Sequence, residues 1–361
     1  MKPRNIAIAC GAAGVAVGLA AAAGIVYRKQ IKSVASLKRL TGYEDGYDLY
    51  AINIAYDYDL DRIIAAGVRD DQAYIDAVVA QVLPGVPAHV QAPQFACSAF
   101  VAVDAEGRVR TGRNYDFKDD TSALLVRNHP RGGYASIGLA ALNNLGDNTP
   151  LDSVAGRAAA LMGPFAQLDG VNECGVSIAV LTLDSKPCDQ DTQRPVINTS
   201  LAIRLVLDRA ATTQEAVDLL SAYDMHAMAG RDYHFFINDA AGDARVVEWD
   251  PRDPDRAFKA TPVRQVTNFY ACYGDEVLPN QKNGELGHGK ERAVAIANVL
   301  DAHVGAQDEA VAWKALRAAA QEPNPEDITS NTQWSVVFDN TEPAAAITLR
   351  RHWGDVDAFA L

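Results

Sequence analysis

The stretch FACSAFVAVDAEGRVRTGRNYDF, residues 95–117, places a cysteine at the head of an alternating apolar run. Asp104–Gly107 then forms a turn, and a second alternating run leads back to an Arg/Asp pair, which is the pattern of a β-hairpin. The start of the first strand and the end of the second strand of a hairpin lie side by side. We therefore expect Cys97, Arg113 and Asp116 to lie close together, as a candidate site.

The residues alone leave two interpretations of this hairpin open. In one, Cys97 is a nucleophile; in the other, it is a buried strand cysteine and residues 33–96 are simply the start of the domain. Arg113 and Asp116 are, in the same way, either charged partners of the thiol or an ordinary exposed turn pair.

The motif CSxF followed by GRNxD resembles the start of the linear-amide C–N hydrolases, which are cysteine N-terminal-nucleophile (Ntn) hydrolases. This group contains bile salt hydrolases, penicillin V acylases, acid ceramidase and N-acylethanolamine acid amidase. Three further segments appear in the order that the family shows, and the similarity spans roughly residues 95–350. They are DGVNECG at 169–175, VTNFY at 266–270 and HGKER at 288–292.

The order of predicted elements, strands followed by helices and then by strands with antiparallel hairpins, indicates an α+β fold in one domain. The resemblance implies the αββα four-layer sandwich of Ntn hydrolases. We expect helices at 34–40, 71–83, 199–211, 212–223, 289–303 and 307–320. Strands are expected at 49–56, 123–126, 176–183, 233–238, 245–249, 263–268, 333–339 and 345–350, and residues 132–142 are expected to form a glycine-containing strand or a loop. Residues 169–175 are expected to form a turn, and residues 143–168, which lack periodicity, a loop on the substrate side.

The resemblance also implies an autocatalytic cut between Ala96 and Cys97, because the thiol of an Ntn hydrolase needs its own α-amine to be free. The chain is then organised as a signal anchor or signal peptide at 1–32, a propeptide at 33–96 and a catalytic domain at 97–361.

A free thiol has a pKa near ~8.5, so Cys97 needs a base or a positive neighbour to react at neutral pH. As a mature N-terminal residue it carries its own base, because an α-amine titrates near ~7.7–8. The resemblance implies that Arg113 lies beside the thiol, lowers its pKa and orients the substrate carbonyl. Asp116 is expected to hold the α-ammonium group.

The resemblance assigns the side chain of Asn268 to the oxyanion hole, with a second contact at Thr182. Bile salt hydrolases carry Asn and penicillin V acylases carry Tyr at the place of Thr182, so the substrate stays open. Arg292 matches an arginine that the family places in the site. The alternatives from the residues alone are a turn Asn and a solvated helix Arg. Asn172 is expected to be structural and to fix the turn of DGVNECG.

None of the seven histidines has a recognisable catalytic setting, and the local cysteine signature of a papain-like enzyme is absent. We expect His234 to be a structural hydrogen-bonding residue and His288 a surface or capping group. The sequence implies no metal and no organic cofactor.

The composition, 48% apolar and 22% charged residues, is that of a globular protein. The net charge is −13. Because five of the 33 basic residues and none of the acidic residues precede residue 36, the rest of the chain is more acidic than this value indicates. A folded part this acidic argues against nucleic acid as a partner. The 22 uncharged residues Ile6–Tyr27 lie between basic flanks, as in a signal anchor or a secretory signal. By the positive-inside rule, the flanking charges favour a catalytic part that faces the cytoplasm. The resemblance favours export instead. We therefore expect a membrane-anchored or secreted protein.

The sequence therefore predicts hydrolysis of a linear amide bond in a small N-acyl amide, through a thioester on Cys97. Two alternatives stay open: an acyltransferase that uses the same thioester, and an unprocessed, membrane-anchored binding protein that retains the fold. The acyl and amine groups are not identified, and the family suggests a homo-oligomer. The spacing of the five cysteines (Cys10, Cys97, Cys174, Cys188 and Cys272) shows no disulfide framework.

Overall fold

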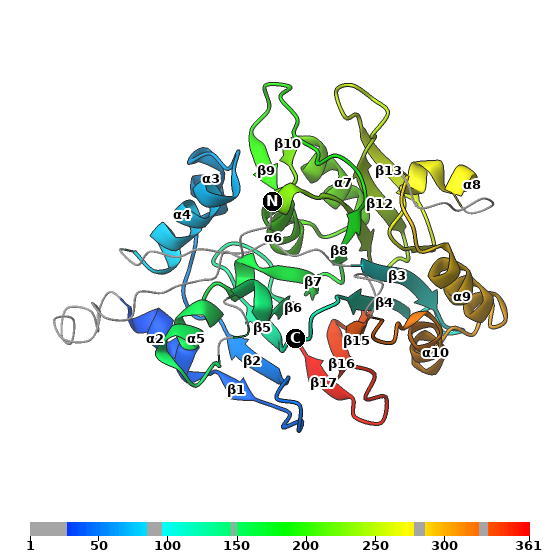
Figure 1. The fold of residues 1–361 in the computed structure, drawn as a ribbon, viewed down its shortest axis with the longest axis horizontal. Coiled ribbons are helices and arrows are strands. Elements are labelled where there is room, and N and C mark those ends of the chain that lie inside the picture. Colours follow the sequence, from blue (N-terminus) through cyan, green and yellow to red (C-terminus); the bar gives the residue numbers. More distant parts are fainter. Residues whose placement is uncertain (1–26, 85–95, 146–147, 149, 278–285, 325–330) are drawn as a thin grey trace.

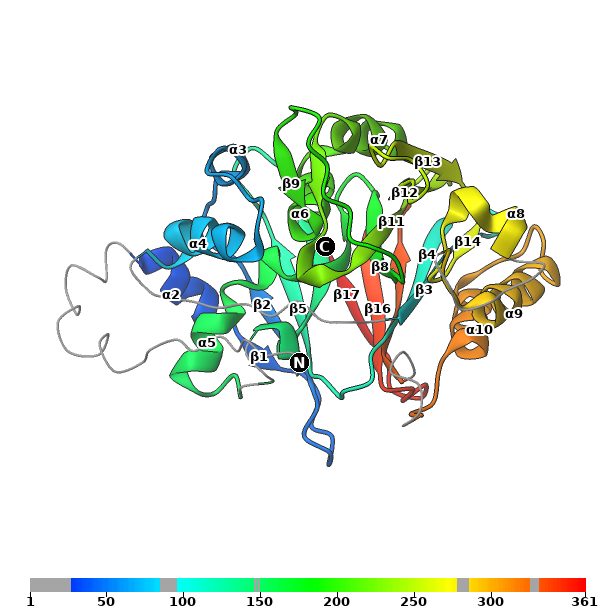
Figure 2. The ribbon, with the colours of Figure 1, turned by 45° about the horizontal axis from the view of Figure 1, so that its top comes forward.

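The computed structural model describes residues 27–84, 96–145, 148, 150–277, 286–324 and 331–361. Two β-sheets pack face to face through β3 and β8, and helices lie on the outer face of each sheet (Figures 1 and 2). The predicted α+β class and the order of its layers are therefore confirmed in this part of the chain.

Within the described residues, the larger sheet has nine strands in the order β1-β2-β5-β6-β7-β8-β11-β12-β13. Neighbouring strands are antiparallel except β2 and β5, which are parallel. The strands are β1 (Lys38–Arg39), β2 (Leu49–Asn53), β5 (Ala123–Asn128), β6 (Ser136–Ala141), β7 (Gln167–Asn172), β8 (Ser177–Leu183), β11 (Asp232–Asn238), β12 (Ala244–Trp249) and β13 (Phe258–Pro262). The strands expected near 49, 123, 176, 233 and 245 are all present, and residues 132–142 contain the strand β6.

The smaller sheet carries the hairpin that the sequence predicts, in the strand order β14-β3-β4-β15-β16-β17. A separate parallel pair joins β9 to β10. The bounds are β3 (Ala96–Val103), β4 (Val109–Asp116), β9 (Val196–Asn198), β10 (Asp224–His226), β14 (Gln265–Val266), β15 (Thr332–Asp339), β16 (Ala344–Leu349) and β17 (Asp357–Ala360). The strand expected at 263–268 is thus shorter than predicted.

Helices α6 (Thr199–Arg209) and α7 (Thr213–Ser221) pack on the larger sheet, and α9 (Lys290–Asp301) and α10 (Glu309–Ala319) pack on the smaller one (Figure 1). Side-chain caps fix the starts of α6 and α7. Asn198 accepts a hydrogen bond from the Leu201 amide at 2.9 Å, and Thr212 accepts one from the Glu215 amide at 3.1 Å. The remaining helices are α2 (Arg28–Ala35), α3 (Leu60–Ala65), α4 (Asp71–Val82), α5 (Val154–Ala160) and α8 (Gly274–Val277), with the 3₁₀ turns η1 (Leu142–Leu145), η2 (Gly163–Phe165), η3 (Met228–Gly230) and η4 (Ala271–Tyr273).

The segment before the hairpin is built into the same fold. Strand β2 pairs with β5 from Leu49↔Ala123 to Asn53↔Arg127 and so extends the larger sheet. Helix α4, which the sequence predicts at 71–83, begins at an Asp70 cap and packs beside the larger sheet through buried residues such as Tyr74 and Val78. Residues 49–82 therefore share the main hydrophobic core with residues that follow Cys97.

The helix expected at 34–40 is wrong. Helix α2 ends at Ala35, and Lys38–Arg39 pairs with β2 instead. The hydroxyl group of Ser36 accepts a hydrogen bond from the Asn53 amide at 2.8 Å. This contact ties the chain to the sheet at the point where the apolar pattern suggested that a helix continues.

The turn expected at 169–175 is shorter than predicted, because β7 continues to Asn172. Gly170 allows this strand to approach its neighbours closely: a Cβ atom there would lie 2.8 Å from the Ile137 carbonyl oxygen. Residues 143–168, expected to be a loop, contain α5 and η2. The structural role of Asn172 is as predicted, since its side-chain oxygen accepts bonds from the amides of Cys174 and Val176 at 3.1 and 3.0 Å.

The predicted membrane or signal segment at 6–27 lies almost entirely outside the described residues. Among the helices that are described, none is long and apolar enough to span a bilayer. The four described cysteines, Cys97, Cys174, Cys188 and Cys272, are free thiols.

Candidate active site

The hairpin register brings the predicted residues together. Cys97 pairs with Tyr115 and Ala99 with Arg113 across β3 and β4, so the thiol and the guanidinium group lie on the same face of the smaller sheet. Ala96 pairs with Asp116 at the open end of the hairpin. The structure thus places Cys97, Arg113 and Asp116 in one neighbourhood, as the sequence predicts.

The Cys97 side chain is fully buried, and its strand β3 packs against β8 of the larger sheet. Burial raises the pKa of its thiol to about 11, while a hydrogen bond and the positive charge of Arg113 act in the opposite direction. In this chain, where the nitrogen of Cys97 is a peptide amide, the sulfur is therefore a protonated thiol at neutral pH. Activating it requires a base.

Arg113 is buried and held in a fixed orientation. Its Nε donates to Asp169 at 2.7 Å, Nη1 to the Asn114 carbonyl oxygen at 2.7 Å, and Nη2 to the Val180 carbonyl oxygen at 3.1 Å. A buried charge is tolerated only with such partners. The guanidinium group is therefore locked beside the sulfur of Cys97.

Asp169 also belongs to the site, although its sequence pattern did not indicate this. It lies on β7, and besides Arg113 it accepts a hydrogen bond from the Trp334 indole nitrogen at 3.1 Å. Its carboxyl group is fully buried, and burial raises its pKa, although Arg113 opposes this effect. Its place in DGVNECG indicated a turn residue, and no local pattern shows that it faces an arginine of another sheet.

Asn268 connects the nucleophile to the larger sheet. Its Oδ1 accepts a hydrogen bond from the Cys97 backbone nitrogen at 2.9 Å, and its Nδ2 donates to the Thr182 carbonyl oxygen at 2.8 Å. The hydroxyl oxygen of Thr182 is buried and has no hydrogen-bond partner in the described part of the chain. Buried polar atoms normally have partners, so this hydroxyl group is available to a bound molecule.

Arg292, at the start of α9, reaches the open end of the hairpin. Its Nη1 donates to the Cys97 carbonyl oxygen at 2.5 Å and its Nη2 to Asn268 Oδ1 at 2.7 Å. Nη1 also lies 3.4 Å from Asp116, whose carboxylate accepts hydrogen bonds from Thr332 at 2.6 Å and Gln321 at 2.9 Å. Arg292 therefore belongs to the same cluster as Cys97 and is not a solvated helix residue.

The two histidines that the sequence singled out have partners other than the thiol. His234 is buried between Glu248 at 3.3 Å and the Thr267 carbonyl oxygen at 3.0 Å, a hydrogen-bonding position of the predicted kind. The ring of His288 lies 3.3 Å from Asp184. Among the described residues, no group of three or more His, Cys, Asp or Glu side chains is arranged to hold a metal ion.

Comparisons with known proteins relate this geometry to a family. The sequence profile of the acyl-coenzyme A:6-aminopenicillanic acid acyl-transferase family matches residues 103–352, more than half of the chain, and begins after Cys97. A comparison with curated proteins gave no match.

Solved structures with the same fold are distant in sequence. Penicillin V acylase from Agrobacterium tumefaciens is 20% identical, with a TM-score of 0.53 over 73% of this chain and 86% of that chain. Two mutants of a conjugated bile acid hydrolase from Clostridium perfringens, one cysteine-to-alanine and one arginine-to-leucine, are each 15% identical. They cover 73% of this chain and 92% of theirs, with TM-scores of 0.57 and 0.55. The chain shares its fold with these structures, and by the profile match it belongs to the acyl-coenzyme A:6-aminopenicillanic acid acyl-transferase family.

Proposed function

We propose that the chain is a cysteine Ntn amidohydrolase that cleaves linear amide bonds through a thioester on Cys97. One observation carries the proposal: Cys97 is the point where Arg113, Asn268 and Arg292 converge on a single residue, through its sulfur, its backbone nitrogen and its carbonyl oxygen. Contacts that fix the sulfur, the backbone nitrogen and the carbonyl oxygen of Cys97 suit an enzyme in which this residue is both nucleophile and base.

The proposed maturation step converts the described chain into the enzyme. The sulfur of Cys97 attacks the carbonyl carbon of Ala96, a C–S bond forms, the Ala96–Cys97 C–N bond breaks, and the proton of the thiol moves to the released nitrogen. Water then hydrolyses this thioester. The products are a chain that ends at Ala96 and a catalytic chain, 97–361, that begins with a free α-amine. In this scheme residues 33–96 are the propeptide, and residues 1–32 direct export or anchor the protein.

In turnover, the α-amine of Cys97 takes the proton of the thiol as the sulfur attacks the amide carbonyl group of the substrate. The proton then passes to the leaving amine, and water hydrolyses the thioester. Asn268 Nδ2 and the unpartnered hydroxyl group of Thr182 are the proposed oxyanion donors, because both lie on the side of the site formed by β8 and the 267–268 segment. Arg113 stabilises the thiolate, whereas Asp116, bonded to Arg292, orients the new N-terminus.

A second function is favoured by the family profile, whose description names an acyl-transferase. In that reaction an amine other than water takes the acyl group from the same thioester. The two reactions share every step up to the thioester, so the residues in the site do not distinguish them.

The test is a panel of glycine- and taurine-conjugated bile salts, penicillin V and N-acyl amides of aliphatic acids, with and without added amine acceptors. We expect release of free acid by the wild-type protein and no release by Cys97→Ala. Dominant formation of a new amide would assign the transferase reaction. An intact chain that binds these amides without turnover would instead support an unprocessed binding protein.

A further inference from the structure

Asn268 lies outside the regular part of the smaller sheet. Strand β14 pairs with β3 at Gln265 and Val266 and ends there, two residues before Asn268. On the side of α9, the His288 amide donates a hydrogen bond to the Asn268 carbonyl oxygen at 2.7 Å. The position of the Asn268 side chain therefore depends on the contacts that hold the backbone next to it.

A buried pair on the larger sheet, His234 and Glu248, supplies such contacts. His234 lies on β11, Glu248 lies on the neighbouring strand β12, and neither side chain is exposed. His234 Nε2 lies 3.0 Å from the Thr267 carbonyl oxygen, which belongs to the peptide bond that leads into Asn268. Glu248 accepts hydrogen bonds from the backbone amides at 271–272, at 3.0 and 2.6 Å. The pair therefore holds the backbone on both sides of Asn268.

The hydrogen-bond partners determine where the protons of this pair lie. A carbonyl oxygen only accepts, so Nε2 of His234 carries a hydrogen and donates it to Thr267. Nδ1 of His234 lies 3.3 Å from Glu248 Oε2, and two lone pairs would repel each other there, so a proton lies between them. Both oxygens of Glu248 accept from backbone amides, which stabilises the ionised carboxylate. The pair therefore consists of an imidazolium ion and a carboxylate.

The groups around Glu248 do not replace His234 as the balancing charge. Burial and the nearby charge of Glu248 raise the pKa of the Cys272 thiol to about 12, so this thiol is neutral and donates a hydrogen bond to the carboxylate. Asp250 and Lys259 also act on Cys272, but they carry opposite charges and their side chains lie 3.7 Å apart. A buried charge is tolerated only with a partner of opposite charge and good hydrogen bonds, and His234 is that partner.

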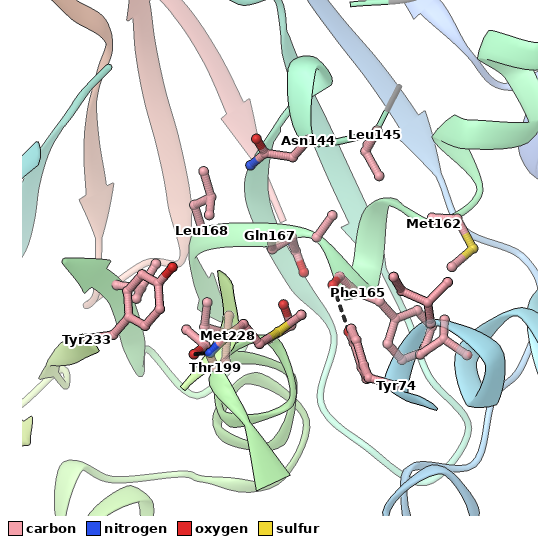
Figure 3. Close-up of a pocket in the computed structure, with 16 residues that line it drawn as sticks. Tyr74, Asn144, Leu145, Met162, Phe165, Gln167, Leu168, Thr199, Met228 and Tyr233 are labelled. Atoms are coloured by element: carbon pink, nitrogen blue, oxygen red, sulfur yellow. Dashed lines mark hydrogen bonds between the residues drawn. The ribbon is translucent and has the colours of Figure 1, made fainter. Parts of the chain in front are cut away.

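His234 faces the smaller sheet. The preceding residue, Tyr233, lines the apolar pocket drawn in Figure 3 together with Met228. Successive side chains of a strand point to opposite faces, so His234 faces away from this pocket. Asn238, four residues further along β11, lies on the same face as His234, and its Nδ2 donates to Thr111 of β4 at 3.0 Å. This orientation brings His234 to the backbone of the 267–268 segment.

We infer that His234 and Glu248 are positioning residues, whose buried ion pair fixes the backbone around Asn268 and so sets the place of its side-chain amide. The inference rests on the proposed function, in which Asn268 Nδ2 is an oxyanion donor while Oδ1 binds the nitrogen of Cys97. Such a donor is effective only when it is held in place before the reaction. The pair acts through Asn268 and takes no part in the bonds that form or break.

The first test compares two leucine substitutions on β11. His234→Leu removes the contacts with Thr267 and Glu248, whereas Asn238→Leu removes a buried hydrogen bond at the other end of the same strand. In the folded, mature proteins, His234→Leu should lower kcat about 10- to 100-fold and change KM by less than about twofold, because a displacement of about 1 Å can cost 10²-fold in rate. Asn238→Leu should keep kcat near the wild-type value. Equal effects of the two variants on kcat overturn the inference while the amidase proposal stands.

A double variant tests the contacts without the charges. His234→Gln/Glu248→Gln keeps a donor for Thr267, an acceptor for the amides at 271–272 and a hydrogen bond between the two side chains. It should recover most of the kcat that His234→Leu loses. A double variant with kcat as low as that of His234→Leu overturns the inference.

A spectroscopic measurement separates this inference from the proposed function. Full-length Cys97→Ala protein is labelled with ¹⁵N-histidine, and the His234 signals are assigned by their loss in His234→Gln. We expect both ring nitrogens of His234 to be protonated at neutral pH, and Nδ1 to lose its proton when Glu248→Gln is added. This result supports the charged pair even if the wild-type protein shows no amidase activity. An unprotonated Nδ1 beside an intact Glu248 overturns the inference, and the measurement needs no leucine variant, so it decides the matter if His234→Leu does not fold.

The side-chain amide of Asn268 reports on positioning directly. In uniformly ¹⁵N-labelled Cys97→Ala protein, its signals are assigned by their loss in Asn268→Ala. They should shift when Glu248→Gln is added and stay in place when Asn238→Leu is added. Signals that stay in place with Glu248→Gln, or that shift equally with both substitutions, overturn the inference.

Discussion

The backbone nitrogen of Cys97 donates a hydrogen bond to Oδ1 of Asn268 at 2.9 Å, across 171 positions of sequence. Asn268 Oδ1 also accepts a bond from Arg292, so a single amide side chain links the nucleophile, the larger sheet and α9. The nitrogen that this contact holds is the atom that the proposed cut releases as an α-amine. The contacts of the site therefore hold the backbone nitrogen of Cys97 as well as its sulfur.

Replacing Asn268 should slow the chemical step. For Asn268→Ala we expect kcat to fall by about 10²–10³, equivalent to ~2.7–4 kcal/mol, because one of the proposed oxyanion donors is lost. Steady-state kinetics of the mature protein measure this. The matched control is Asn172→Ala, in which the lost side chain bonds only to structural backbone groups. Asn172→Ala should lower the free energy of unfolding and leave kcat of the folded protein near the wild-type value. If Asn172→Ala lowers kcat more than Asn268→Ala does, Asn268 has no part in the mechanism.

The hydroxyl group of Thr182 offers a sharper test of the oxyanion hole. Because that oxygen has no partner among the described residues, Thr182→Val should keep or raise the free energy of unfolding. It should nevertheless lower kcat, and Thr182→Ser should restore it. Kinetics and urea unfolding of the three proteins give both quantities. A valine variant with full activity would show that Thr182 does not contact the reacting carbonyl group.

Asp169 is expected to stabilise the fold through Arg113. Asp169→Asn leaves a buried guanidinium group without its charged partner, which costs ~3–5 kcal/mol. Urea unfolding measures the loss. The control is Asp191→Asn, which breaks an ion pair with Arg69 at the surface and should cost less than about 1 kcal/mol. Equal losses would mean that the Arg113–Asp169 pair is not buried as described.

The reactivity of the thiol should depend on Arg113 in a defined direction. Burial raises the pKa of Cys97 and Arg113 lowers it, so removing the cation must move this pKa further upward. The double variant Arg113→Gln/Asp169→Asn avoids leaving a lone buried carboxylate. Its alkylation at Cys97 should begin at higher pH than in the wild-type protein. Mass spectrometry of iodoacetamide-treated samples across pH measures this.

The control for this pH profile is Arg110→Gln/Asp104→Asn, an ion pair on the same hairpin that lies away from the sulfur. Its profile should overlay that of the wild type. If both double variants shift the profile equally, the effect comes from the hairpin as a whole and not from the guanidinium group beside Cys97.

The sequence predicts best what local patterns encode. The alternation of 97–103, the turn at Asp104–Gly107 and the GRNxD motif sufficed to place Cys97 and Arg113 together. The capping sequence at Thr212 located α7 correctly. These features depend on residues that are close along the chain, so they form without contacts from a second sheet.

The errors arise where distant contacts decide. The apolar pattern at 34–40 suggested a helix, but Ser36 and Arg39 bond to β2. Asp169 was taken as a turn residue, because only the packing of β7 against the smaller sheet brings its carboxylate to Arg113. The buried face of α4 is a further case, because no pattern in residues 71–82 indicates which part of the protein that face covers.

The account depends most directly on whether Cys97 becomes the first residue of a chain. Intact-mass measurement and N-terminal sequencing of purified, active wild-type protein test this, with Cys97→Ala as the comparison. We expect two chains that co-purify, the second beginning at Cys97, and a single uncut chain for Cys97→Ala. A wild-type protein that turns over amides while Cys97 remains joined to Ala96 would contradict the account.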